Sequence, residues 1–512
     1  MSKDVRDFLF RLDKIDSVWY NKVNWCAFAR IEDHPWLIIR CKRYIRSVAK
    51  MLNKFHTLLI SPYYSFFILL LSVIGYSFGD ASIIAAMIVL VQLVALTLCL
   101  SDDLAPTLLP ILSLIVLGTT LIGRMELMTP WIPCAYTLIP AVVLHFVWYR
   151  KYKALRVGPS FYALLGTAAA ILLGGIGNLA SIDFSSPIVW YYLLMMSVGL
   201  VALYLLFASE VKREKSYDQL RYFLLTLVFI GVLCTVVIGK NFFTWVLGSE
   251  KPLRVYDYFL LIPYRNVIAN LLLLCLPAPF YFAGYTEDRL CPQILYFSVG
   301  FLFFGAMLLT AARAALVFGG VMLLCCLVYY LCSHKKWYCK LINFLVVVAG
   351  LTLLVYFFHE PILQLISSRL EGGVASPNEA RWKLLLRSFE DFRDHPFFGI
   401  GFCSSQNADV YSAEGCVSWY HLYFPQIWGS LGLFGCVTFF YQLLVRARLA
   451  LYKPSAKTVA LVLCYLGIFF YSQFDPGEFV PIPFAALAVL MFVYLERHCE
   501  ENGKYRIYKK RK

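Results

Sequence analysis

Long apolar segments recur along most of the chain and alternate with short polar segments. A helix needs about 20 mostly apolar residues to cross a bilayer, because it rises about 1.5 Å per residue through a hydrocarbon layer about 30 Å thick. Fourteen segments approach this length, at residues 57–79, 81–100, 104–123, 130–149, 159–177, 187–208, 222–239, 266–286, 293–312, 314–332, 341–358, 425–445, 458–473 and 482–495. The pattern predicts an all-α integral membrane protein with about 14 transmembrane helices, and with 12 as the lower bound.

Prolines interrupt two of these segments. Pro130, Pro133 and Pro140 fall in the fourth segment, and Pro277 and Pro279 fall in the eighth. Proline has no backbone N–H and leaves a carbonyl of the preceding turn without its helical partner. We therefore expect these two helices to be bent or broken.

The composition supports a membrane protein over other classes. Hydrophobic residues make up 60% of the 512 residues and charged residues only 15%, whereas soluble chains carry about 25% charged residues. This excludes a disordered chain, a coiled coil and a set of soluble domains. The formal charge of +15 comes from basic residues between apolar segments, which indicates membrane edges and not nucleic acid.

The basic residues also predict the orientation. Of the 46 Lys and Arg residues, 35 lie on one side of the predicted membrane, and that side is cytoplasmic by the positive-inside rule. It includes both termini and the loops around 150–156, 209–221, 333–340 and 446–457. The N-terminus has no apolar core of the kind that marks a cleavable signal peptide. Apolar positions at spacings of three and four over 34–55 predict a basic amphipathic helix in the cytoplasmic interface.

One outer loop, at residues 359–424, departs from the composition of the rest. It holds five basic residues, eight acids and three of the eight histidines, and long ordered loops are usually functional. We expect helices at 361–371 and 377–393, the second capped by Ser376. The apolar stripe of the second helix either packs on the membrane domain or lies in the outer interface; it consists of Trp382, Leu385, Leu386, Phe389 and Phe392.

These features divide the chain into five parts. They are the basic amphipathic segment 1–56, the membrane domain 57–358, the outer loop 359–424, the last three spans at 425–495 and the basic tail 496–512.

Four short motifs follow one another in the second half of the chain. They are Arg381-Trp382, Asp394-His395-Pro396-Phe397-Phe398-Gly399-Ile400-Gly401, His421-Leu422-Tyr423 and Gly429-Ser430-Leu431-Gly432-Leu433-Phe434-Gly435. In this order and spacing they resemble the O-antigen ligase and Wzy-type polymerase superfamily. An arginine between two earlier spans, which the family also carries, is matched by Arg313. The resemblance covers about residues 300–440. It departs from the family where Leu422 replaces an expected Asn and where alanines flank Arg313.

The resemblance implies a metal-independent, inverting glycosyltransferase on the outer face of the bacterial inner membrane. Its donor would be a glycan on a polyprenyl diphosphate, and its acceptor a glycan or glycolipid, so that ligase and polymerase stay open. Arg313 and Arg381 would bind the diphosphate, because guanidinium groups bind phosphate oxygens bidentately. His421 would be the base that takes a proton from the acceptor hydroxyl.

Each of these residues also has a structural alternative. Arg313 is an arginine at a span end that snorkels to the headgroups, and His421 is an interfacial histidine among aromatic residues. Weaker substrate-binding candidates are Lys383, Arg387, Arg254 and Arg265. Lys383 and Arg387 instead pair with nearby acids on a solvated helix face in the alternative interpretation.

Other sequence features limit the chemistry. No outer Asp-x-Asp motif and no Walker-type loop are present, so we expect no metal, nucleotide or other cofactor. Cys403 and Cys416 both lie in the outer loop, where a disulfide and free thiols are both compatible with the sequence. The rival functional class is a lipid-linked oligosaccharide flippase, and a structural scaffold is a third; the charge concentrated in one outer loop favours the enzyme over both.

Overall fold

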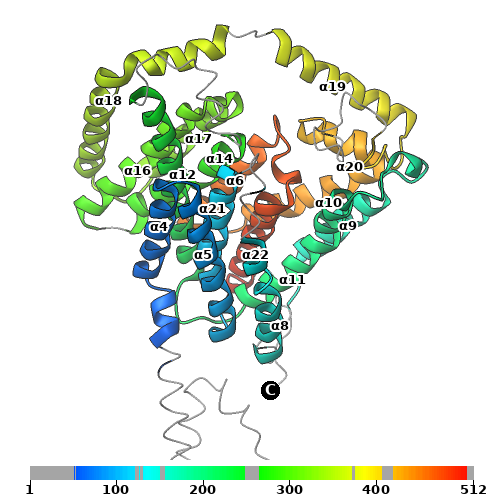
Figure 1. Cartoon of the computed structure of the whole chain (residues 1–512), viewed down its shortest axis with the longest axis horizontal. Helices are drawn as coiled ribbons and strands as arrows, with labels where there is room; N and C mark the ends of the chain where they lie inside the picture. The colour runs from blue at the N-terminus through cyan, green and yellow to red at the C-terminus, as the bar shows by residue number, and fades with distance from the viewer. Residues whose placement is uncertain are drawn as a thin grey trace, which may run out of the picture.

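The computed structural model describes residues 51, 54–121, 126, 131–149, 156–247, 265–286, 288–371, 375–405 and 419–503. Over these residues the regular structure is helical, and the β structure is limited to one isolated bridge between Ile182 and Ser404. The helices pack into one bundle, in which several helices are inclined to their neighbours (Figure 1). The all-helical membrane fold expected from the sequence is confirmed.

Among the described residues, ten helical segments are long and apolar enough to cross a membrane. They are α5 (Asp80–Leu100), α7–α8 (Trp131–Tyr149), α10–α11 (Pro187–Val211), α12 (Gln219–Leu247), α14–η6 (Arg265–Thr286), α16 (Leu290–Thr310), α17 (Arg313–Leu331), the Trp337–Leu365 part of α18 (Trp337–Glu371), α20 (Tyr423–Ala450) and η8–α22 (Pro481–Glu501). Four shorter apolar helices are α4 (Pro62–Ser77), η1–α6 (Ala105–Leu121), α9 (Pro159–Leu173) and α21 (Ala456–Tyr471). Every predicted segment therefore overlaps a helix, while ten of them reach spanning length; fourteen spans remains a prediction.

The two segments that carry prolines are broken as expected. The fourth divides into α7 (Trp131–Ala135) and α8 (Leu138–Tyr149). The eighth divides into α14 (Arg265–Cys275), α15 (Pro277–Tyr281) and the π-helical η6 (Phe282–Thr286). Loss of proline N–H groups from the helical ladder explains both interruptions.

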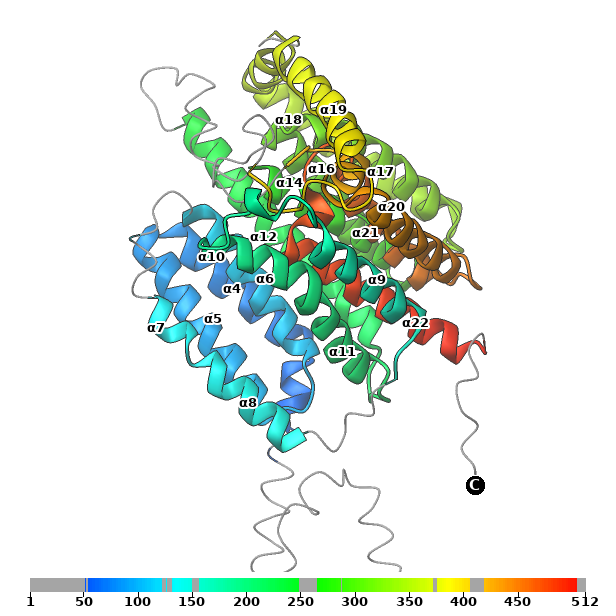
Figure 2. The same ribbon diagram turned by 90° about the vertical axis from the view of Figure 1, so that its right-hand side faces the viewer.

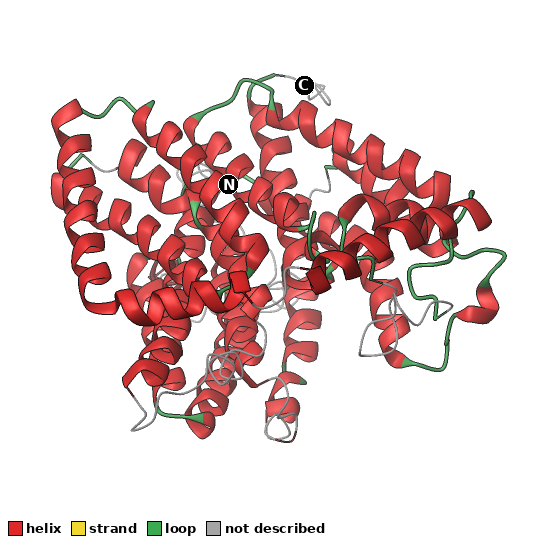
Figure 3. Ribbon diagram, turned by 90° about the horizontal axis from the view of Figure 1, so that it is seen from above, coloured by secondary structure: helices red, strands yellow, loops and turns green. Residues whose placement is uncertain are grey.

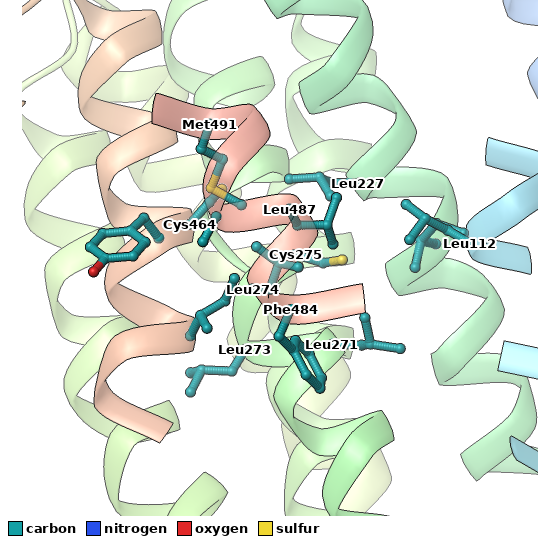
Figure 4. Packing of buried hydrophobic residues seen from close by; sticks show 14 of the residues in the cluster. Leu112, Leu227, Leu271, Leu273, Leu274, Cys275, Cys464, Phe484, Leu487 and Met491 are labelled. Atoms are coloured by element: carbon teal, nitrogen blue, oxygen red, sulfur yellow. The ribbon is translucent and has the colours of Figure 1, made fainter. Parts of the chain in front are cut away.

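The hydrophobic core lies where α12, α14, α21 and α22 meet. Leu271, Leu274 and Cys275 of α14 pack near Leu487 and Met491 of α22 (Figure 4). All five side chains are almost completely buried. By contrast, α18 lies at the edge of the bundle with most of its apolar side chains exposed, as expected for a helix surrounded by lipid (Figures 1 and 2).

The long loop folds over one end of the bundle. α18 continues to Glu371 past non-helical backbone at Phe358, so the short helix expected at 361–371 is the kinked end of a longer one. The second loop helix, α19 (Ala375–Asp394), begins two residues before the expected Pro377, which places Ser376 in its first turn and not at its cap. Viewed from above, the loop helices cross the ends of several membrane helices (Figure 3).

The opposite end of the bundle carries buried ion pairs. Lys212 lies 2.9 Å from Glu496, and Lys215 lies 3.3 Å from Asp103. Tyr217 also donates a 2.7 Å hydrogen bond to Asp103. These contacts hold the loop between α11 (Leu200–Val211) and α12 against the ends of neighbouring helices. Residues 1–50, which include most of the predicted interfacial helix, and the tail from residue 504 lie outside the described residues.

Candidate functional site

A glycine turn of the long loop interlocks with a kink in α20. Gly399 and Gly432 both have φ of +63°, a left-handed conformation that favours glycine. Gly432 interrupts the helical backbone of α20, and the loop takes up the freed groups: Leu433 N–H donates to Pro396 O at 2.8 Å and Gly401 N–H donates to Ser430 O at 2.9 Å. The two glycine motifs of the sequence are thus one structural unit.

This interlock holds α19 against α20. The Tyr420 hydroxyl donates a 2.6 Å hydrogen bond to Asp391, and the Trp428 indole donates a 2.8 Å hydrogen bond to Ser388. Burial and the neighbouring Asp391 carboxylate raise the pKa of Tyr420, so the hydroxyl stays protonated and keeps donating. Since the same helix carries Arg381, these contacts fix that arginine relative to the membrane helices.

Three predicted arginines meet at one cavity, which we call the arginine cavity. It holds about 190 Å³ and is lined by Arg265, Asn266, Ala311, Ala312, Arg313, Ala314, Arg381, Tyr471, Phe474 and Asp475. Arg265 begins α14, Arg313 begins α17, and Arg381 lies near the start of α19. Residues far apart in the chain therefore create one strongly cationic site.

The backbone adds to the positive potential of the arginine cavity. A helix N-terminus carries about half a positive charge, and α17 begins at the cavity with Arg313. The N-cap of α17, Ala312, offers no side-chain hydrogen bond to the first turn. This arrangement of guanidinium groups and a helix start suits an anion with several oxygens, such as a diphosphate.

Arg381 also binds the loop that follows α21. Its guanidinium donates a 3.2 Å hydrogen bond to Phe474 O and lies 5.7 Å from the centre of the Phe474 ring. The loop is held further along by Glu478, whose carboxylate pairs with the buried Arg446 and whose N–H donates to Ser472 Oγ at 2.8 Å. These contacts therefore hold Phe474 and Asp475, which form one wall of the arginine cavity, in position.

His421 lies beside the arginine cavity and contacts it through Asp475. His421 Nδ1 is 3.6 Å from Asp475 Oδ1, and the Tyr471 hydroxyl donates to the other oxygen of Asp475 at 3.3 Å. The histidine has φ of +54°, and its side chain is 44% exposed, so it is held in the left-handed region while its ring stays accessible. A carboxylate beside one ring nitrogen favours a tautomer whose other nitrogen accepts a proton.

Of the remaining candidates, Lys383 and Arg387 do not line the cavity. Lys383 is exposed on α19, and Arg387 pairs with Glu390 at 3.0 Å and with Asp391 at 3.3 Å, as the solvated-face alternative expected. Arg254 lies outside the described residues. The thiol group of Cys403 is buried close to Val189 O. Its possible partner Cys416 lies outside the described residues, so the disulfide question stays open.

The structure adds Asp475 to the site. Sequence reasoning missed it because two acids in a short segment between apolar helices resemble an ordinary polar turn. The available signal was that Asp475 and Glu478 are the only acids between residues 457 and 496. Arg265, a weaker candidate by sequence, lines the cavity together with Arg313 and Arg381.

The fold and site define a multi-pass α-helical membrane protein with a cationic cavity under a helical loop. Residues 298–440 match the family model described as O-antigen ligase. The resemblance to the O-antigen ligase and Wzy-type polymerase superfamily is thereby confirmed over this range, which includes Arg313, Arg381 and His421. The match supports a glycosyltransferase-like role in glycan assembly. No curated protein matches the chain.

Proposed function

We propose that this protein transfers a glycan from a polyprenyl diphosphate carrier to an acceptor hydroxyl at the outer face of the bacterial inner membrane. The observation that carries the proposal is the convergence of Arg265, Arg313 and Arg381 on one cavity whose wall includes the carboxylate partner of His421. The family match at residues 298–440 supports the same class of reaction. Both termini would be cytoplasmic, as the basic loops predict.

The arginines would stabilise the leaving group. When the glycosyl bond breaks, the diphosphate gains negative charge, and preorganised donors around it lower the barrier more than they stabilise the ground state. Guanidinium forks match phosphate oxygens in pairs, which a lysine ammonium does not. In this proposal the three arginines and the start of α17 supply the positive charge.

His421 would activate the acceptor. Its exposed ring would take the proton from an acceptor hydroxyl as that oxygen attacks the anomeric carbon, and Asp475 would hold the ring and stabilise its protonated form. Attack opposite the leaving diphosphate in a single displacement inverts the anomeric configuration. The 3.6 Å separation between His421 and Asp475 is compatible with a contact that shortens when substrates bind.

The decisive experiment is a reaction of purified protein in liposomes with a lipid-linked glycan and a lipid acceptor. A longer glycan on the carrier indicates a polymerase, and transfer to the second lipid indicates a ligase. Movement of the carrier across the bilayer without a new glycosidic bond would establish the alternative, a flippase. A variant at Arg381 is compared with a variant at Gly350, which is exposed on α18 and does not line the arginine cavity. Loss of transfer in the Arg381 variant alone indicates a chemical defect, whereas loss in both indicates a folding defect.

A further inference from the structure

The loop helix α19 has an exposed apolar stripe that no described part of the protein covers. The stripe consists of Trp382, Leu386 and Phe389, whose exposed fractions are 60%, 47% and 52%. At about 100° per residue these three side chains fall within an arc of about 60°. The spacing was visible in the sequence, but burial could not be inferred from it, because packing on the bundle and immersion in lipid produce the same pattern.

The other sides of α19 differ from this stripe. One side is attached to the protein through the buried Ser388 and Asp391 and through the hydrogen bond of Arg381. Lys383 and Glu390 are exposed directly beside the stripe, about 100° and about 80° around the helix from Trp382. The exposed surface of the helix therefore changes from apolar to charged side chains around its circumference, which is the arrangement of a helix that lies at a boundary between lipid and water.

The apolar stripe also adjoins α20. Phe389 stacks on Trp428 with ring centres 5.0 Å apart and an angle of 22° between the rings. Phe424, one turn before Trp428 on α20, is 45% exposed. α20 is long and apolar enough to span a membrane. The stripe thus lies next to an exposed apolar residue at the beginning of a candidate membrane span.

We infer that the Trp382-Leu386-Phe389 stripe of α19 is inserted into the outer leaflet of the bilayer at the boundary between headgroups and acyl chains. Tryptophan favours this depth because its ring is apolar and its N–H is polar. The insertion does not depend on the proposed function. If that function holds, the inserted helix keeps Arg381 at the depth where the diphosphate of a lipid carrier lies.

Photo-crosslinking of the full-length protein in phospholipid nanodiscs tests this inference. The photoreactive residue p-benzoylphenylalanine replaces Trp382 in one variant and Lys383, which is exposed about 100° around the helix, in the matched control. Mass spectrometry after irradiation should detect phospholipid adducts at position 382 severalfold more often than at position 383. A third variant, with the same residue at Leu386, should behave like the first and controls for local misfolding at Trp382.

Two outcomes would overturn the inference. Equal lipid adduct formation at 382 and 383 would show that α19 has no preferred membrane-facing side. Adducts at 386 and 382 with protein only would identify the stripe as a docking surface for another polypeptide. Lipid crosslinking is measured independently of catalysis. A variant that loses transfer activity therefore tests the proposed function, and its lipid adducts still test the membrane insertion of α19.

Discussion

Replacing Gly432 by alanine should disrupt the interlock between the loop and α20. A Cβ atom at this position would lie 2.5 Å from the carbonyl carbon of Phe397 and 2.7 Å from the nitrogen of Gly399, and both are backbone atoms that cannot rotate away. The backbone of Gly432 also has φ of +63°, which costs a residue with a side chain roughly 1–2 kcal/mol. Overpacking typically costs a further 1–3 kcal/mol, so the expected loss is about 2–5 kcal/mol.

The assay for this prediction is the thermal unfolding midpoint in detergent, measured together with glycan transfer. Gly432→Ala should lower the midpoint and abolish transfer, because α19 and Arg381 depend on the interlock for their position. Gly350→Ala is the matched control: no atom lies within 4 Å of its Cβ position, and alanine is favoured in a helix by about 0.5–1 kcal/mol. A Gly432→Ala protein as stable and active as the control would refute the claim that this contact positions the site.

Three further predictions concern the chemistry and the orientation. Arg381→Lys keeps a positive charge but loses the bidentate fork, so transfer should fall strongly while the unfolding midpoint changes little; equal activity would argue against a diphosphate role. His421→Ala should lower the rate of transfer by roughly 100- to 10,000-fold while donor binding persists. Asp475→Asn should lower the rate of transfer and change its pH profile. Substitutions at His421 that leave transfer unchanged would show that this residue is only an interfacial anchor. In a cysteine-free background, an impermeant thiol reagent added from outside should label a cysteine at position 393 but not at position 213, and the reverse result would invert the topology.

The membrane fold was largely predictable from the sequence because its signal is local. Each apolar segment must satisfy its own backbone hydrogen bonds within the bilayer, which makes a helix the outcome wherever such a segment is long enough. The breaks near Pro133 and Pro277 follow from the same local rule. The boundaries were less accurate: α18 continues past Phe358 to Glu371, and α19 begins at Ala375, because the fraying and joining of helix ends depend on neighbouring elements.

The candidate site was only partly predictable. Arg313, Arg381 and His421 stood out because they belong to motifs that resemble those of the O-antigen ligase and Wzy-type polymerase superfamily. Their convergence was not visible, since α17, α19 and the residues before α20 are separated by long stretches of sequence. Lys383, near Arg381 in the sequence, is instead exposed, because a shift of two residues turns a side chain to a different face of the helix.

The amino-acid sequence alone determined the helical membrane class, the predicted orientation and the residue types available for phosphate chemistry. These properties depend on hydrophobicity and charge counted over short windows, which need no knowledge of contacts. Only the tertiary structure decided that Arg265 and Asp475 belong to the arginine cavity and that two glycine motifs form one interlock. Such decisions depend on which helices pack together, and packing is set by contacts between residues that are distant in the chain.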